Sequence, residues 1–247
     1  MIQALCGAVL AAAVAVIAYR ARALTLGGAA AAFAVGTAVF ASGGWPAAAV
    51  LFAFFIPSTL VSRIGPAKRS SPRSGWQVLA NGGVAALCAL AATRAGVPFS
   101  AAFAGAFAAA SADTWGTEIG TLSRTPPVSI LSFRRVEAGR SGGVTALGSA
   151  ATLGGAFCVA IVASAVHIAP FWSVAAGGIA GALLDSVLGA SLQALRWCPE
   201  CERECETRVH RCGSPTALRR GLGWLENDGV NFAATLGGAI VASLAVS

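Results

Sequence analysis

Long apolar stretches alternate with short polar connections along the whole chain. A helix needs about 20 mostly apolar residues to cross the hydrocarbon core of a membrane. Eight stretches come close to this length, at residues 1–19, 24–41, 45–61, 78–97, 99–122, 143–168, 171–195 and 226–246. The pattern predicts an all-α, polytopic membrane bundle of about eight helices, forming a single domain over residues 1–247. The second and third stretches are short, and a re-entrant pair is the alternative for them.

The composition supports this class and excludes two others. Only 11% of the 247 residues are charged, whereas an ordinary soluble domain has roughly 25%. Hydrophobic residues make up 56%, and the mean hydropathy is +0.74. A soluble protein could not cover its surface with so few charges. Intrinsic disorder needs low hydrophobicity and high net charge, so it is excluded as well.

The basic residues indicate an orientation in the membrane. Sixteen of the 17 lie in four alternate connections, and only Arg94 lies near the other side. The sixteen are Arg20, Arg22, Arg63, Lys68, Arg69, Arg73, Arg124, Arg134, Arg135, Arg140, Arg196, Arg203, Arg208, Arg211, Arg219 and Arg220. The positive-inside rule places these connections on the cytoplasmic side, and both chain ends then face outward. The net charge of +7 thus reflects topology, and we do not expect nucleic acid as a partner.

Acidic residues inside the fifth stretch are the first candidate site. An acid at the bilayer centre costs about 2.5–3.5 kcal/mol on insertion scales, so it favours a functional role. Asp113, Thr114 and Glu118 lie in the cytoplasmic half of this stretch. Thr114 and Glu118 share a helix face, whereas Asp113 and Glu118 point about 140° apart. One ion could join the two acids only if the helix unwinds there, which Gly116 would permit.

Three further polar groups fall toward the same cytoplasmic side. They are Asp185, Ser186 and Gln193 in the seventh stretch, Asn227, Asp228 and Asn231 at the start of the eighth, and Gln77 and Asn81 at the start of the fourth. Oxygen ligands on several helices suit Mg²⁺, which takes one or two carboxylates together with substrate phosphates. The alternatives are interhelical hydrogen bonds, helix caps and, for Asp228, a favourable interaction with the helix dipole.

A glycine-rich basic connection precedes the sixth stretch. Glycines allow backbone N–H groups to converge on an anion, and a helix that begins directly afterwards adds its positive end. The residues concerned are Arg134, Arg135, Arg140, Ser141, Gly142 and Gly143. The connection lacks the Gly-Lys-Ser/Thr ending of a Walker A loop. Phosphate binding is therefore one interpretation, and contact with anionic lipid headgroups is the other. The same two interpretations apply to the second basic connection, with Arg63, Lys68, Arg69 and Arg73.

A cysteine-rich connection, at residues 196–224, is predicted as a small cytoplasmic insertion. Cys198 and Cys201 are followed by His210 and Cys212, which together give four soft ligands for one tetrahedral Zn²⁺. Cys205 is a spare or alternative ligand. The zinc would be structural, because four protein ligands leave no open position for catalysis. Reduced free thiols are the alternative, since a cytoplasmic location disfavours stable disulfides.

Seven ordered motifs resemble the integral-membrane domain-of-unknown-function family 92, which includes plant phytyl-phosphate kinase and human transmembrane protein 19. They begin at Arg22, Phe55, Gln77, Ala112, Gly139, Leu184 and Leu225, and they cover nearly the whole chain. The Asp-Thr and glycine-rich motifs are also similar to those of dolichol kinase and membrane cytidylyltransferases. The chain departs from the family pattern before Gln77, where Ser70-Ser-Pro-Arg73-Ser-Gly-Trp76 replaces a more highly charged run, and at Arg140, where a small residue is usual.

The resemblance implies phosphoryl transfer from a nucleoside triphosphate (CTP, GTP or ATP) to an isoprenyl monophosphate such as phytyl or geranylgeranyl phosphate. It implies that Asp113, Glu118, Asp185 and Asp228 hold Mg²⁺, and that the polar residues above bind nucleotide and substrate phosphates. The alternatives are a lipid-phosphate nucleotidyltransferase and an ion-coupled transporter. The expected partners are the lipid bilayer and the isoprenyl phosphate, and a homo-oligomer remains open.

Overall fold

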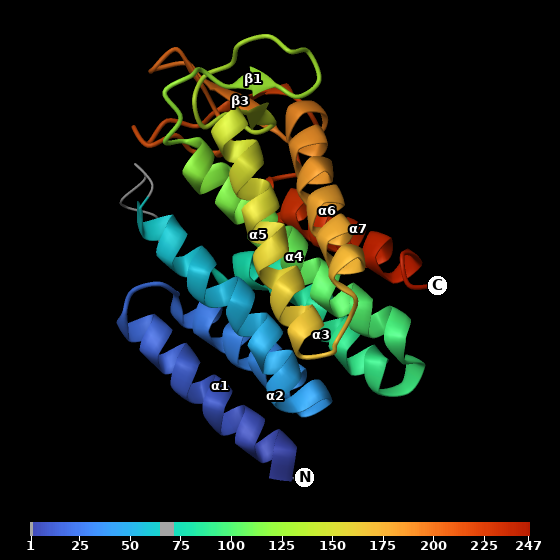
Figure 1. Cartoon of the computed structure of the whole chain (residues 1–247). Coiled ribbons are helices and arrows are strands. Elements are labelled where there is room, and N and C mark those ends of the chain that lie inside the picture. The colour runs from blue at the N-terminus through green and yellow to red at the C-terminus, as the bar shows by residue number, and fades with distance from the viewer. Residues whose placement is uncertain (1, 65–71) are drawn as a thin grey trace.

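The computed structural model describes residues 2–64 and 72–247, and it is an all-helical bundle with small strands at one end (Figure 1). This confirms the predicted all-α class, whereas the number of eight crossings stays a prediction. Within the described residues there are seven helices: α1 (Ile2–Arg20), α2 (Leu26–Ile64), α3 (Gly75–Ala95), α4 (Val97–Gly120), α5 (Ala146–Ala165), α6 (Phe171–Ser191) and α7 (Asn227–Leu244). Each of the eight predicted apolar stretches falls in one of these helices, because the second and third both lie in α2.

Helix α2 doubles back on itself at Gly44, which has non-helical backbone angles of φ 59° and ψ −144°. Glycine adopts this positive φ without the steric cost that a Cβ brings. Both ends of α2 lie near Arg73. Thr25 N–H donates to the Arg73 carbonyl oxygen at 3.0 Å, and Arg73 Nη2 donates to Ser62 Oγ at 3.0 Å. The 39-residue helix is therefore an antiparallel pair of helical segments rather than one long rod.

Helix α4 forms the centre of the bundle, and residues 101–112 are buried throughout. It packs against α5, α6 and α7 through glycine and alanine. A Cβ on Gly238 of α7 would lie 2.9 Å from the carbonyl oxygens of both Gly105 in α4 and Gly177 in α6. The three backbones approach this closely only because no side chain intervenes, as is typical of helix packing in membranes.

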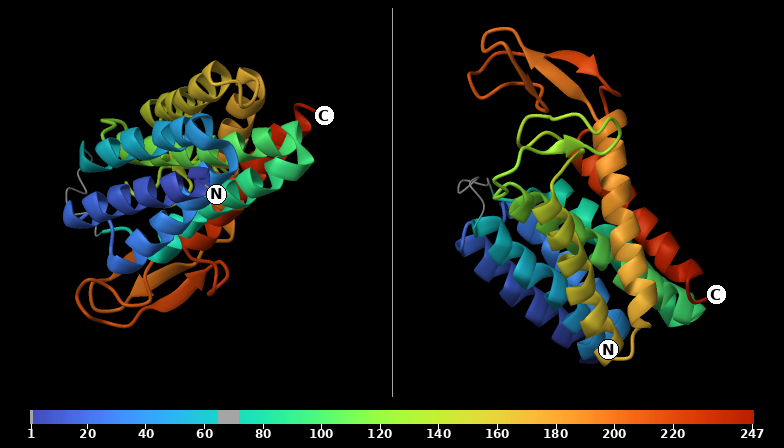
Figure 2. Two further views of the ribbon diagram at one scale, coloured as in Figure 1. Left: turned by 90° about the horizontal axis from the view of Figure 1, so that it is seen from below. Right: turned by 45° about the horizontal axis from the view of Figure 1, so that its top comes forward.

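The strands lie at the end of the bundle that carries the basic connections. One hairpin pairs β1 (Val128–Ser129) with β2 (Gly143–Val144), and a three-stranded antiparallel sheet has the order β4 (Arg203–Cys205), β3 (Leu195–Cys198), β5 (Ala217–Arg220). In Figures 1 and 2 the α3–α4 and α5–α6 turns and both chain ends lie toward the opposite end. The polar and basic connections thus share one end of the molecule.

The outer faces of the helices are apolar, and exposed tryptophans lie near both ends. Among the described residues, five helices are long and apolar enough to cross a membrane, namely α1, α2, α3, α5 and α6. At the basic end, Trp76 lies at the start of α3 and Trp224 precedes α7. At the other end, Trp45 and Trp172 adjoin the turns. All four are between 67% and 76% exposed. Tryptophan prefers the membrane–water interface, so the two pairs mark the borders of the membrane-facing belt.

Candidate active site

A polar cavity of about 480 Å³ opens at the basic end of the bundle. Residues of α3, α4, α5, α6 and α7 and of the glycine-rich connection line it. Thirteen residues predicted from the sequence are among them: Gln77, Asn81, Asp113, Thr114, Glu118, Arg140, Ser141, Gly142, Gly143, Asp185, Ser186, Asn227 and Asn231. Five motifs that are far apart in the sequence therefore meet at one cavity.

Two carboxyl groups face each other at this cavity. Asp113 of α4 lies within hydrogen-bond reach of Asp185 of α6 and of Thr117 one turn further along α4. The Oδ2 atom of Asp185 is buried, and it has no hydrogen-bond partner among the described residues. Adjacent buried carboxylates repel each other unless a proton or a cation lies between them. The pair is therefore the strongest cation-binding feature of the cavity.

Close packing of α4 against α6 brings the two acids together. A Cβ on Gly181, one turn before Asp185, would lie 2.4 Å from the Cβ of Ala109, one turn before Asp113. Only a glycine permits this approach without a shift of one helix. The distance between the helices, and with it the distance between the carboxyl groups, thus depends on small residues that carry no chemistry themselves.

Glu118 lies on the same cavity but has different partners. Helix α4 runs without interruption through Gly116 to Gly120, so it does not unwind in the way that a shared ion of Asp113 and Glu118 would need. Gly116 instead allows close packing, because a Cβ there would lie 2.3 Å from Thr152 Oγ1 of α5. The Glu118 carboxyl lies within hydrogen-bond reach of Ser62 and near the Arg73 guanidinium.

Arg73 also lines the cavity, whereas the sequence named it only as one of four basic residues in a connection that could bind phosphate or lipid headgroups. Its backbone pairs with the α1–α2 connection, where Arg73 N–H donates to Ala23 O at 2.9 Å. Burial lowers the pKa of Arg73, and the negative charge of Glu118 partly offsets this effect. A cation at this depth needs an anionic partner, which Glu118 provides in part. Lys68 and Arg69 of the same predicted basic connection lie outside the described residues.

Polar residues at the start of α3 combine structural and site roles. Gln77 completes a capping box with Ser74, because Ser74 N–H donates to Gln77 Oε1 at 2.8 Å and Gln77 N–H donates to Ser74 Oγ at 3.2 Å. Asn81 Nδ2 donates to Gln77 O at 2.8 Å, and Thr114 Oγ1 donates to Ala110 O at 2.8 Å. The remaining polar atoms of these side chains are those that can contact a ligand in the cavity.

The glycine-rich connection packs tightly against the end of α6. Gly142 has φ +77°, and a Cβ on it would lie within 2.6 Å of three atoms of Ala190. Two backbone amides of the connection have partners within the protein, since Ser141 N–H donates to Glu206 Oε1 and Gly143 N–H donates to Arg140 O, both at 3.0 Å. Helix α5 begins directly afterwards, with Thr145 as its N-cap. The glycines therefore serve close packing as well as access to the cavity.

Positive charge at the mouth of the cavity is partly balanced by the cysteine-rich connection. Arg140 Nη1 forms an ion pair with Glu204 Oε2 at 3.0 Å, and Glu204 Oε1 lies 3.4 Å from Arg219 Nη1. Burial lowers the pKa of Arg220, and the nearby charge of Arg140 lowers it further, whereas Glu204 and Glu206 raise it. Three arginines and two glutamates thus form an ionic cluster beside the glycine-rich connection.

Four predicted site residues do not line the cavity. Arg134 and Arg135 are exposed on the β1–β2 hairpin. Gln193 is buried, and its Nε2 donates to Ser141 Oγ at 3.0 Å and to Glu206 Oε2 at 2.8 Å, so it supports the glycine-rich connection from behind. Asp228 lies in the first turn of α7, but its helix presents Asn227 and Asn231 to the cavity instead.

A second, apolar cavity of about 90 Å³ lies beside the polar one. It is enclosed mainly by aliphatic and aromatic side chains of α1 and α2, such as Leu10 and Phe55. Arg73, Gln77 and Asn81 line both cavities. A polar chamber and an apolar chamber therefore adjoin at the start of α3.

The cysteine-rich connection gathers the four predicted zinc ligands. One ligand atom from each of Cys198, Cys201, His210 and Cys212 lies within 4.8 Å of the others. A hydrogen bond from His210, together with one from the Ser214 backbone, lowers the pKa of Cys212 to about 6. Cys205 lies outside this group, and its thiol donates to Thr207 O at 3.8 Å.

An apolar bundle with a charged cavity at one end defines a multi-pass integral membrane protein with a candidate phosphate and cation site. Comparison with known proteins identifies its family. The family described as integral membrane protein DUF92 matches residues 9–239, and the chain belongs to this family.

Relatives occur in plants, archaea and cyanobacteria. The chain is 30% identical to Protein PGR of Arabidopsis thaliana, over 92% of this chain and 90% of the relative. It is 32% identical to an uncharacterized membrane protein of Methanocaldococcus jannaschii, over 79% of this chain and 74% of the relative. An uncharacterized membrane protein of Synechocystis is 27% identical over 66% of this chain and 69% of the relative. No solved structure matches the chain.

Proposed function

We propose that the chain is a membrane kinase that transfers a phosphoryl group from a nucleoside triphosphate to an isoprenyl monophosphate. The observation that carries this proposal is the junction of the two cavities. Paired acids and arginines line the polar chamber, and an apolar chamber shares Arg73, Gln77 and Asn81 with it. A substrate with a phosphate head and a hydrocarbon tail matches this division of polar and apolar surface, although only the first part of a long tail fits in the apolar chamber of about 90 Å³.

Phosphoryl transfer needs positioning and charge neutralisation more than covalent help from the protein. Asp113 and Asp185 fit the ligand set of Mg²⁺, which takes one or two carboxylates and completes its shell with phosphate oxygens and water. When bound, the ion would neutralise charge on the triphosphate. In this proposal Arg140, which lines the polar chamber, contacts the nucleotide phosphates, and Arg73, which lines both chambers, contacts the phosphate of the isoprenyl acceptor.

The proposed reaction forms one phosphorus–oxygen bond and breaks another. An oxygen of the isoprenyl monophosphate attacks the γ-phosphorus, and the bond from that phosphorus to the oxygen bridging the β-phosphate breaks. The products are the isoprenyl diphosphate and the nucleoside diphosphate. The acceptor is already an anion, so no strong general base is needed.

The topology that we propose has eight crossings, with the cavity and the basic connections on the cytoplasmic side. Helix α2 supplies two crossings, because 39 helical residues would extend about 58 Å, roughly twice the hydrocarbon thickness. Both of its ends lie at Arg73, as two passes require. The four central helices α3, α4, α5 and α6, together with α1 and α7, supply the other six. Both chain ends then face the opposite side.

Product analysis tests this function. Purified protein in lipid vesicles is supplied with Mg²⁺, phytyl or geranylgeranyl phosphate, and CTP, GTP or ATP labelled at the α- or γ-phosphate. We expect γ-label, and no α-label, in an isoprenyl diphosphate. Transfer of α-label with release of pyrophosphate would instead show a nucleotidyltransferase. Folded protein that forms no labelled lipid with any donor contradicts both reactions, and nucleotide-independent flux of substrate across the vesicle membrane would indicate a transporter.

A further inference from the structure

The cysteine-rich connection has a compact cluster of thiols and imidazole that the proposed kinase chemistry does not use. Cys198 Sγ lies 3.6 Å from Cys212 Sγ, and His210 Nδ1 lies 3.2 Å from Cys212 Sγ. These separations exceed the bond length of a disulfide, about 2.05 Å, and all seven cysteines are free. Three sulfurs and one nitrogen thus converge without a covalent link.

The spacing matches a tetrahedral metal site. With Zn–S bonds of about 2.3 Å and Zn–N bonds of about 2.0–2.1 Å, ligand atoms of a tetrahedron lie about 3.6–3.8 Å apart. The distances within the cluster, from 3.2 Å to a maximum of 4.8 Å, bracket this value. Three cysteines with one histidine are a common ligand set for structural zinc, and four protein ligands leave no open position.

The two ligand pairs lie in similar turns. Cys198 and Cys201 are followed by Glu202 with φ +50°, and Cys212 is followed by Gly213 with φ +88°. A non-glycine residue with positive φ costs free energy, so its presence at Glu202 indicates that the turn is held by its surroundings. In both turns the residue with positive φ, Glu202 or Gly213, follows the last ligand, and the chain then returns toward the sheet.

We infer that Cys198, Cys201, His210 and Cys212 bind one structural Zn²⁺, and that this ion holds the glycine-rich connection in place over the cavity. The metal site stands on its own geometry, whereas its importance for catalysis rests on the proposed function. Strands β4 and β5 contain no buried residue, so a metal would supply much of the free energy that folds the sheet of β3, β4 and β5.

Two glutamates connect the sheet to the residues that line the cavity. Glu206, which follows β4 directly, accepts from Ser141 N–H at 3.0 Å and from Gln193 Nε2 at 2.8 Å. Glu204 within β4 forms the ion pair with Arg140. Strand β4 pairs with β3, whose last residue is the ligand Cys198. The metal and the glycine-rich connection are therefore joined through one strand pair.

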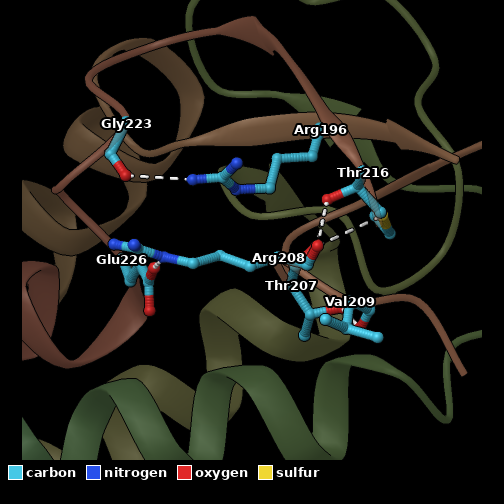
Figure 3. Close-up of polar contacts among 8 residues, drawn as sticks. Arg196, Thr207, Arg208, Val209, Thr216, Gly223 and Glu226 are labelled. Atoms are coloured by element: carbon cyan, nitrogen blue, oxygen red, sulfur yellow. Dashed lines mark hydrogen bonds and ion pairs between the residues drawn. The ribbon is translucent and has the colours of Figure 1, made fainter. Parts of the chain in front are cut away.

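The sheet is fixed to the helices at its other edge as well. Figure 3 shows Arg196 of β3 pointing to the carbonyl oxygen of Gly223, at 3.0 Å, and Arg208 reaching Glu226 at 2.6 Å. Thr216 Oγ1 donates to Thr207 O at 2.7 Å across the second ligand turn. These contacts anchor the sheet next to α7, so loss of the metal would loosen the glycine-rich connection more than the bundle.

Metal content tests the site directly. Protein purified without chelator should contain about one zinc per chain, and Co²⁺ in its place should give the visible spectrum of tetrahedral thiolate coordination. Cys212→Ser should lose most of the zinc. Cys205→Ser is the matched control, since Cys205 lies in the same connection but outside the cluster, and it should retain zinc.

Hydrogen exchange tests the coupling without any measurement of activity. Removal of zinc by a chelator should speed amide exchange at residues 139–145 by at least about tenfold, while exchange in α4 stays unchanged. Glu206→Ala should speed the same exchange and keep the zinc. Wild-type protein that holds neither zinc nor tetrahedral Co²⁺ overturns the metal site, as does equal zinc in Cys212→Ser and wild type. Exchange that is unaffected by chelation overturns the coupling, whether or not the kinase reaction is found.

Discussion

The two aspartates at the cavity show that an acid within an apolar helix can mark a candidate site. Asp113 and Asp185 are conspicuous in the sequence because an acid within an apolar helix is costly. Their partnership could not be predicted from the sequence, because it depends on the approach of α4 to α6 at Gly181 and Ala109. The same cost also drew attention to Glu118 and Asp228, yet Glu118 lies near Ser62 and the charge of Arg73, and Asp228 does not line the cavity.

Binding of a divalent metal ion should distinguish Asp113 and Asp185 from Asp228. Asp113→Asn and Asp185→Asn should each weaken the binding of Mn²⁺, a paramagnetic substitute for Mg²⁺, by at least about tenfold in the presence of nucleotide. Asp228→Asn should retain most of the affinity, because its carboxyl is not on the cavity wall. Electron paramagnetic resonance of free Mn²⁺ measures all three. Loss of affinity in Asp228→Asn alone would show that the ion lies at the start of α7 instead.

At the scale of the elements, the bundle depends on glycines where α4, α6 and α7 meet. The boundaries of these helices follow from hydropathy, which is a strong signal, and the predicted stretches agree with them to within a few residues. The contacts between helices are not encoded in such a simple pattern, because many of the 30 glycines could serve packing. The capping box at Ser74 and Gln77 is a local feature that only the structure shows, whereas the break at Gly44 falls in the gap predicted between the stretches 24–41 and 45–61.

Substitution of Gly238 tests this packing. Gly238→Ala places a methyl group 2.9 Å from two backbone carbonyl oxygens, so the helices must separate. Overpacking of this kind costs about 1–3 kcal/mol, and the midpoint of thermal unfolding in detergent should fall by several degrees. Gly83→Ala is the control, because its nearest neighbour would lie 3.9 Å away in ordinary contact, and its midpoint should not fall. Equal midpoints for the two variants would contradict the close packing.

At the scale of the molecule, charge is separated along the bundle. The basic connections and the polar cavity share one end, and the chain ends lie toward the other (Figure 1). The distribution of the basic residues was sufficient to predict this separation, because orientation follows the positive charge. The sequence did not distinguish Arg73 from the other basic residues of its connection, since that connection departs from the family pattern and the burial of Arg73 arises only when α2 folds back beside it.

Peptide tags test the proposed orientation. Tags at the two chain ends should be accessible to antibody in intact cells, and a tag inserted beside the exposed Phe133 should become accessible only after permeabilisation. An even number of crossings places both ends on the same side. If one chain end is accessible only from outside and the other only from inside, the number of crossings is odd. Helix α2 then crosses once, or another helix does not cross.

The central claim is that the acidic pair supports phosphoryl transfer to an isoprenyl phosphate. Loss of one metal ligand removes several kcal/mol of transition-state stabilisation, which corresponds to about 100-fold or more in rate. The most direct measurement is the rate of γ-label transfer to geranylgeranyl phosphate by wild type, Asp185→Asn and the exposed control Glu137→Gln, with thermal unfolding to confirm that each is folded. We predict transfer by wild type and Glu137→Gln and a loss of at least about 100-fold in Asp185→Asn. Equal rates in all three folded proteins would contradict the account.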